Sequence, residues 1–101
     1  MHVGILTAPF GNEPLEKVFE FARQHGFKTL ELACGYGHPH LNLESPDVDT
    51  LKRLMDKTGV GLSAIAFYTN NTHPDPAERQ RNNDGVRKAI EIARALGVSV
   101  V

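Results

Sequence analysis

The chain has a single cysteine, no tryptophan and no long run of one charge. With Cys34 alone among 101 residues, no internal disulfide can form, and a reducing compartment is the expected setting. No apolar stretch approaches the roughly 20 residues that a membrane-spanning helix needs. The formal net charge is −1, without a basic stripe that would favour nucleic acid. These features predict a cytoplasmic chain whose partners include neither nucleic acid nor a membrane.

What the chain does contain is an ordinary globular composition and a repeated pattern. Hydrophobic residues make up 41% and charged residues 23%, which is typical of a folded domain. Three segments each pass from an amphipathic helix end, through a glycine, into an apolar run. The glycines are Gly26, Gly59 and Gly97. Because glycine adopts positive φ without a Cβ penalty, it is the expected residue after a helix. The pattern therefore predicts repeated strand–loop–helix units.

The starts of the helices are marked by side-chain oxygens followed by prolines. Asn12, Ser45 and Asp75 each precede an amphipathic stretch with a proline in its first turn. Such an oxygen accepts a hydrogen bond from an otherwise unpaired N–H group, and proline has no N–H to lose. These signals predict three helices, the third spanning about 76–96. Helical spacing predicts an apolar face on that third helix, made of Val86, Ala89, Ile90, Ala93 and Leu96.

Four apolar runs predict strands at 2–8, 28–34, 60–67 and 98–101. Strands that alternate with helices predict a parallel βαβαβαβ arrangement, an α/β fold, over residues 1–101 as one domain. Two architectures fit this order. One is an open doubly wound sheet, and the other is the N-terminal part of a (β/α)8 TIM barrel, about three and a half of its eight units.

Candidate functional residues follow the predicted strands, because ligands bind at the carboxyl ends of parallel strands in both architectures. Glu31 interrupts an apolar run, so its carboxylate either binds sugar hydroxyls inside a barrel mouth or faces solvent or a salt bridge. Tyr68, Asn70 and Asn71 follow the third strand. Their amides and hydroxyl suit sugar hydroxyls, and asparagine is equally favoured in turns. Cys34 is interpreted as a small buried hydrophobic residue.

Three loop histidines are candidates for metal binding. His38 and His40 form an H-x-H pair without a nearby carboxylate or cysteine, a pattern more typical of exposed loop histidines than of a metal site. His73, directly before Pro74, fits a metal ligand, a substrate contact or a turn residue. The sequence contains no complete dinucleotide or phosphate-loop motif.

Four stretches carry a resemblance to a known family: VGILTAPF, GFKTLEL, GLSAIAFYTNNTHPDPAERQ and VRKAIEIARALGVSVV. They resemble the N-terminal part of sugar phosphate isomerases and epimerases of the xylose isomerase-like TIM-barrel superfamily, which also contains endonuclease IV. The resemblance implies a divalent metal, Mn²⁺, Mg²⁺, Co²⁺ or Zn²⁺, that polarises sugar oxygens. Paired glutamates would move a proton between adjacent carbons of a ketose or aldose.

The resemblance also implies that the metal ligands and the acid–base residues lie on later strands, outside this chain. It assigns Phe10, Glu31, Asn70 and His73 as substrate contacts, and no catalytic or metal-binding residue. We therefore expect a truncated N-terminal portion of such an isomerase, inactive alone, that self-associates through exposed sheet edges. The alternatives are an endonuclease IV-like fragment in which His73 binds zinc, a half-barrel that dimerises, and a small non-catalytic α/β binding module.

Overall fold

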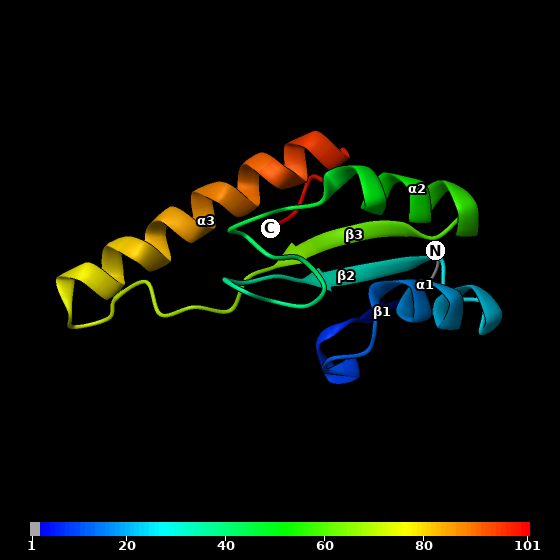
Figure 1. Cartoon of the computed structure of the whole chain (residues 1–101), viewed down its shortest axis with the longest axis horizontal. Coiled ribbons are helices and arrows are strands. Elements are labelled where there is room, and N and C mark those ends of the chain that lie inside the picture. Colours follow the sequence, from blue (N-terminus) through cyan, green and yellow to red (C-terminus); the bar gives the residue numbers. More distant parts are fainter. Residues whose placement is uncertain (1–2) are drawn as a thin grey trace.

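Strands and helices alternate along the chain. The computed structural model describes residues 3–101, so residue 2 of the predicted first strand lies outside the described part. The elements are β1 (Gly4–Leu6), the 3-10 helix η1 (Ala8–Phe10), α1 (Leu15–Gln24), β2 (Thr29–Ala33), α2 (Val48–Thr58), β3 (Gly61–Ala66) and α3 (Pro76–Leu96) (Figure 1). The predicted α/β fold is confirmed, and each of these three strands is shorter than predicted.

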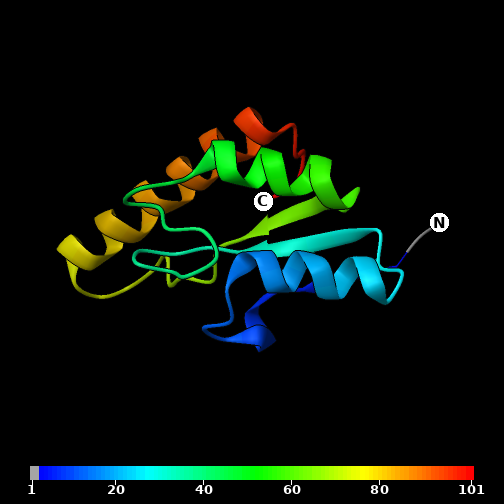
Figure 2. The ribbon, with the colours of Figure 1, turned by 45° about the vertical axis from the view of Figure 1, so that its right-hand side comes forward.

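The sheet is parallel and keeps the order of the chain, with β2 between β1 and β3. α1 packs against α2, and α2 packs against α3 (Figures 1 and 2). The core between these helices and one face of the sheet includes the fully buried Phe19, Leu30, Leu32 and Ile65. A doubly wound sheet reverses its strand order and carries helices on both faces, whereas a barrel wall does neither. The arrangement is that of a partial TIM barrel.

One extra residue interrupts the pairing of β2 with β3. Leu30 lies opposite Leu62, and the next residue, Glu31, lies opposite Ala64. Ser63 is the residue left over, and its hydroxyl donates a hydrogen bond to the carbonyl of Leu30 at 3.3 Å. This β-bulge explains why the third apolar run lacks a regular alternation of apolar and polar residues.

The predicted fourth strand at 98–101 is wrong for the described structure. These residues lie beside β3, where the N–H of Ile65 donates to the carbonyl of Val100 at 3.0 Å, but they form no strand. Val98 is buried, whereas Val100 and Val101 are 53% and 49% exposed. A strand at this edge needs a ladder of hydrogen bonds and apolar neighbours for its valines, and one bond does not supply either.

Two of the predicted helix caps are also wrong. Asp47, not Ser45, caps α2, because its carboxylate accepts a hydrogen bond from the N–H of Thr50 at 3.1 Å. α1 starts after Pro14 without a side-chain cap, so Asn12 does not serve as one. Both helices start two or more residues later than the capping pattern predicts. Where several polar residues stand in a row, packing of the apolar face selects the start.

α3 has the predicted bounds and the predicted cap, Asp75. Its buried residues are Gly85, Ala89, Ile92, Ala93 and Leu96. The prediction of Ile90 on this face is wrong, since Ile90 is 52% exposed. The buried face of α3 instead includes Gly85, which lies against the ring of Phe67. The polar N-terminal half of α3 extends beyond the sheet (Figures 1 and 2).

Candidate functional site

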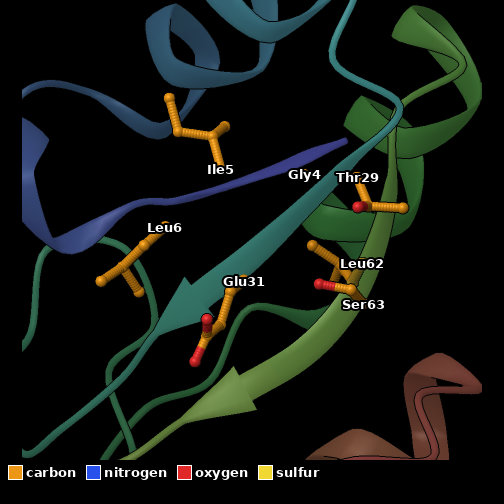
Figure 3. Close-up of a pocket in the computed structure, with 7 residues that line it drawn as sticks. All are labelled: Gly4, Ile5, Leu6, Thr29, Glu31, Leu62 and Ser63. Carbon is orange, nitrogen blue, oxygen red and sulfur yellow. The ribbon is translucent and has the colours of Figure 1, made fainter. Parts of the chain in front are cut away.

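A hollow of about 550 Å³ lies on the sheet face opposite the helices. It is lined by Gly4, Ile5, Leu6, Thr29, Glu31, Leu62 and Ser63 (Figure 3). Strand pairing explains why this space is empty. Thr29 lies between Gly4 and Gly61, and Glu31 has Ala64 beside it on β3. Small neighbours next to each polar side chain leave room in front of the sheet.

Glu31 is the acidic group of this hollow. Its side chain is half-buried, and Figure 3 shows the carboxylate projecting from β2. Within residues 3–101, the carboxylate accepts no hydrogen bond and has no Lys, Arg or His nitrogen within 4.0 Å. All of its acceptor positions therefore remain available to a ligand that carries hydroxyl groups. The hydroxyl of Thr29 can both donate and accept, and the hydroxyl of Ser63, which donates to the carbonyl of Leu30, can accept.

Thr7 fixes the carboxyl ends of the first two strands and was not among the predicted site residues. It is fully buried, and its hydroxyl oxygen accepts a hydrogen bond from the N–H of Ala33 at 2.9 Å. Its own N–H donates to the carbonyl of Glu31 at 3.0 Å. Thr7 thus holds the backbone of β2 directly after the Cα of Glu31. In the sequence, the sign of this role is a threonine directly after the apolar run that forms β1.

Phe10 lies beside the hollow rather than in it. Its ring meets the ring of Phe21 edge to face, with 5.3 Å between ring centroids. Together with Ile5, Leu6 and Pro9, the two rings line a separate apolar cleft of about 240 Å³. The hollow and the cleft share Leu6 and Ile5 in their walls.

Asn70 and His73 occupy the loop after β3 and do not line the hollow. The amide oxygen of Asn70 accepts hydrogen bonds from the N–H and the hydroxyl of Thr72, each at 3.0 Å. The carbonyl of Asn70 accepts from the side chain of Asn82 at 2.8 Å. The structure therefore places Glu31 in the hollow, whereas Phe10, Asn70 and His73 lie outside it.

Two loops use the same His-Pro-X turn. In each, the Nδ1 atom of the histidine accepts a hydrogen bond from the N–H two residues later. His38 accepts from His40, and His73 accepts from Asp75, both at 3.1 Å. Since a backbone N–H can only donate, the lone pair of Nδ1 is used, and the neutral ring carries its proton on Nε2. A metal-binding histidine usually has the opposite arrangement, with one nitrogen donating and the other free to coordinate. Both rings are set as hydrogen-bond donors.

The hydrogen bonding of the His40 ring is the opposite of that of His38 and His73. Its Nε2 donates to the carbonyl of Glu13 at 3.0 Å, and its Nδ1 is buried without a partner among the described residues. Burial and the neighbouring His40 lower the pKa of His38 below its ordinary value. Within residues 3–101, no group of three or more His, Cys, Asp or Glu side chains is placed to hold a metal ion. The described residues do not fit a divalent metal site.

Cys34, at the end of β2, is 6% exposed. Burial raises the pKa of its thiol to about 11. A thiol with such a pKa is almost entirely protonated near neutral pH and is a poor nucleophile.

A parallel sheet in chain order, with helices on one face and an open hollow on the other, defines the wall of a TIM barrel. The chain belongs to the xylose isomerase-like TIM-barrel family, whose model matches residues 19–101. This finding confirms the resemblance seen in the sequence.

The chain is also similar to a curated relative from Bacillus subtilis (strain 168), which is named "Uncharacterized protein YfiH". The two are 31% identical over 109 aligned residues, which include all of this chain and 34% of the relative. The chain therefore spans about a third of the length of this relative. Within residues 3–101, no helix combines the length and hydrophobicity that crossing a membrane requires.

Proposed function

We propose that this chain supplies part of the sugar-binding wall of a divalent-metal-dependent sugar or sugar phosphate isomerase or epimerase. The observation that carries the proposal is the hollow on the inner sheet face, with Glu31 unpaired inside it. Membership in the xylose isomerase-like family supports the same class of substrate.

The chemistry of the hollow suits a polyol. A carboxylate accepts hydrogen bonds strongly, and charge-assisted bonds are about twice as strong as neutral ones. Glu31 would accept from a sugar hydroxyl, while Thr29 on β2 and Ser63 on β3 would hold neighbouring hydroxyls. Leu6, opposite Glu31 on β1, offers apolar surface to the carbon face of the sugar. These residues bind and orient the substrate.

Metal binding and proton transfer are proposed to come from residues outside this chain. Two findings support this division: the described residues hold no set of three metal-ligating side chains, and the chain covers 34% of its relative. A bound Mn²⁺, Mg²⁺, Co²⁺ or Zn²⁺ ion would polarise the sugar oxygens. We expect no isomerisation of a ketose by the 101-residue chain with Mn²⁺.

Titration of the ¹⁵N-labelled chain with D-fructose, followed by NMR, tests the sugar-binding role. We expect saturable shifts at the amides of Thr29, Glu31 and Ser63. Glu31→Gln keeps the shape but removes the charge, and should weaken binding about tenfold. Glu16→Gln, at an exposed position of α1, is the matched control. Equal binding by Glu31→Gln and the wild-type chain, or no shift in the hollow, would overturn the proposal.

An endonuclease IV-like function receives less support. It would need His73 as a zinc ligand, and the hydrogen bond from the N–H of Asp75 already occupies the Nδ1 lone pair of His73.

A further inference from the structure

A second cavity, of about 750 Å³, lies between the loop that follows β2 and residues 77–91 of α3. Tyr36 forms one wall, and Arg81, Arg87 and Lys88 contribute three positive charges from the helix. The cavity shares no lining residue with the hollow that contains Glu31. It is therefore a separate place on the molecule.

The Tyr36 ring is held firmly in this cavity. Its hydroxyl donates a hydrogen bond to the carbonyl of Arg81 at 2.9 Å. Its edge meets the ring of Phe67, with 6.3 Å between centroids and 79° between planes. The missing side chain of Gly85 lets both rings approach α3 closely, since a Cβ there would lie 2.5 Å from Phe67. The face of the Tyr36 ring is left as a rigid aromatic wall.

Two cations lie over the Tyr36 ring. The guanidinium carbon of Arg81 lies 4.0 Å from the ring centroid, and the ammonium of Lys88 lies 5.3 Å from it. Both distances are in the range of a cation–π contact. One ring thereby draws together two like charges from positions two helical turns apart.

Protein carboxylates balance these charges poorly. Arg81 has one ion pair, a long one of 3.6 Å to Glu44. Among residues 3–101, neither Arg87 nor Lys88 has a carboxylate within 4.0 Å. Asp84 and Glu91 also line the cavity, and the carboxylate of Asp84 accepts a hydrogen bond from the side chain of Gln80 at 2.9 Å. Among residues 3–101, the side chains of Arg87 and Lys88 are thus free of carboxylate partners and can donate to an anion, and Arg81 can add the N–H groups that do not face Glu44.

We propose that this cavity binds a phosphoryl group, from either a phosphorylated sugar or free phosphate. Arginine donates to phosphate through two parallel N–H groups, and lysine adds a point charge. The Tyr36 ring contributes by holding the side chains of Arg81 and Lys88 near one another. The hollow is a poor place for the same group, because the carboxylate of Glu31 repels it. The site thus goes beyond the sugar-binding role and does not depend on it.

NMR titration of the 101-residue chain with sodium phosphate, D-fructose 6-phosphate and D-fructose tests the site. We expect phosphate to shift the amide of Tyr36 and those of residues 80–91 in a saturable way. The Arg87→Gln/Lys88→Gln double variant should weaken phosphate binding about tenfold. Lys17→Gln/Lys52→Gln removes the same charge from exposed positions on α1 and α2, and should leave binding unchanged. D-Fructose should leave these amides unmoved.

Comparison of D-fructose 6-phosphate with sodium phosphate distinguishes the two sources of the phosphoryl group. Tighter binding of the sugar phosphate, reduced by Tyr36→Leu, identifies a phosphorylated sugar, whereas equal binding identifies free phosphate. Equal weakening by both double variants would show general charge attraction and overturn the site, as would the absence of saturable shifts at residues 80–91. Sugar binding in the hollow is read separately, from D-fructose and Glu31→Gln.

Discussion

Side chains at the carboxyl ends of the strands are mostly committed to backbone groups. Thr7 satisfies the N–H of Ala33, and the turn histidines His38 and His73 accept backbone N–H groups through Nδ1. Glu31 is different, because its carboxylate has no partner in the described part of the chain. In the hollow, the capacity to recognise a ligand therefore lies mainly in the carboxylate of Glu31, while its neighbours set the geometry around it.

The buried thiol of Cys34 gives a prediction about pH. In the folded chain its pKa is about 11, against an ordinary value of 9.0, so at pH 8 the thiolate fraction is about 100-fold lower than in the unfolded chain. We expect labelling by a thiol reagent at pH 8 to be at least about 100-fold slower in the native chain than in denaturant.

The same shift affects stability. Because the pKa of Cys34 is raised in the folded chain, the thiol's contribution to the free energy of unfolding is fully present below about pH 9. This contribution is lost as the pH rises toward 11. Cys34→Ser should remove this part of the alkaline pH dependence, as measured by urea unfolding. Native labelling as fast as in denaturant would contradict the buried position.

At the scale of helices and strands, the packing of α3 on the sheet depends on one glycine. Glycine in a helix costs about 1 kcal/mol relative to alanine, so Gly85 needs a reason within the fold. A Cβ at this position would lie 2.5 Å and 2.7 Å from two ring atoms of Phe67 and 3.3 Å from Tyr36. Close approach of two aromatic rings is that reason.

Gly85→Ala is therefore expected to destabilise the chain in spite of its better helix propensity. Overpacking typically costs 1–3 kcal/mol, and we expect a net loss of about 1 kcal/mol in the free energy of unfolding. The measurement is chemical denaturation followed by circular dichroism. The Phe67→Leu/Gly85→Ala double variant should recover part of the loss, because it removes the ring atoms that collide. A gain in stability from Gly85→Ala alone would show that Phe67 moves freely.

The sequence predicts a helix end or a buried face well when the residues that determine it are neighbours along the chain. Gly59, Gly97 and Asp75 mark helix ends through their own conformation or hydrogen bonds, and these predictions are confirmed. Ser45 and Ile90 fail because packing at a distance decides which nearby residue caps a helix and which face is buried. For the same reason, a linear pattern does not predict that Gly4, Thr29 and Glu31 line one hollow.

At the scale of the whole molecule, three strands form an open sheet with two edges. β1 has a neighbour on one side among the described residues, and the outer side of β3 is met by one hydrogen bond from Ile65 to Val100. Val3 and Val101, near these two edges, are 66% and 49% exposed. Unpaired edges with apolar side chains favour pairing between molecules.

We predict that the chain self-associates in a concentration-dependent way, as measured by sedimentation velocity. Val3→Lys/Val101→Lys places charges at both edges and should shift the equilibrium toward monomer. Asn12→Lys/Gln24→Lys adds the same charge at exposed positions away from the edges and serves as the control. A wild-type chain that stays monomeric at high concentration would contradict this prediction, and equal effects of both variants would point to net charge instead.

The bulge at Ser63 gives β3 one residue more than a regular strand needs to pass β2. Leu62 and Ile65 both pack against the helix-side core although they are three positions apart, a spacing that places residues of a regular strand on opposite faces. Deleting Ser63 would leave these two residues two positions apart, the spacing of a regular strand, with Ala64 still opposite Glu31 and Ile65 still opposite Leu32. Inserting a residue instead would need a second bulge, or would turn every later residue of β3 to the other face of the sheet. This strand therefore accommodates the loss of one residue at the bulge more easily than the gain of one.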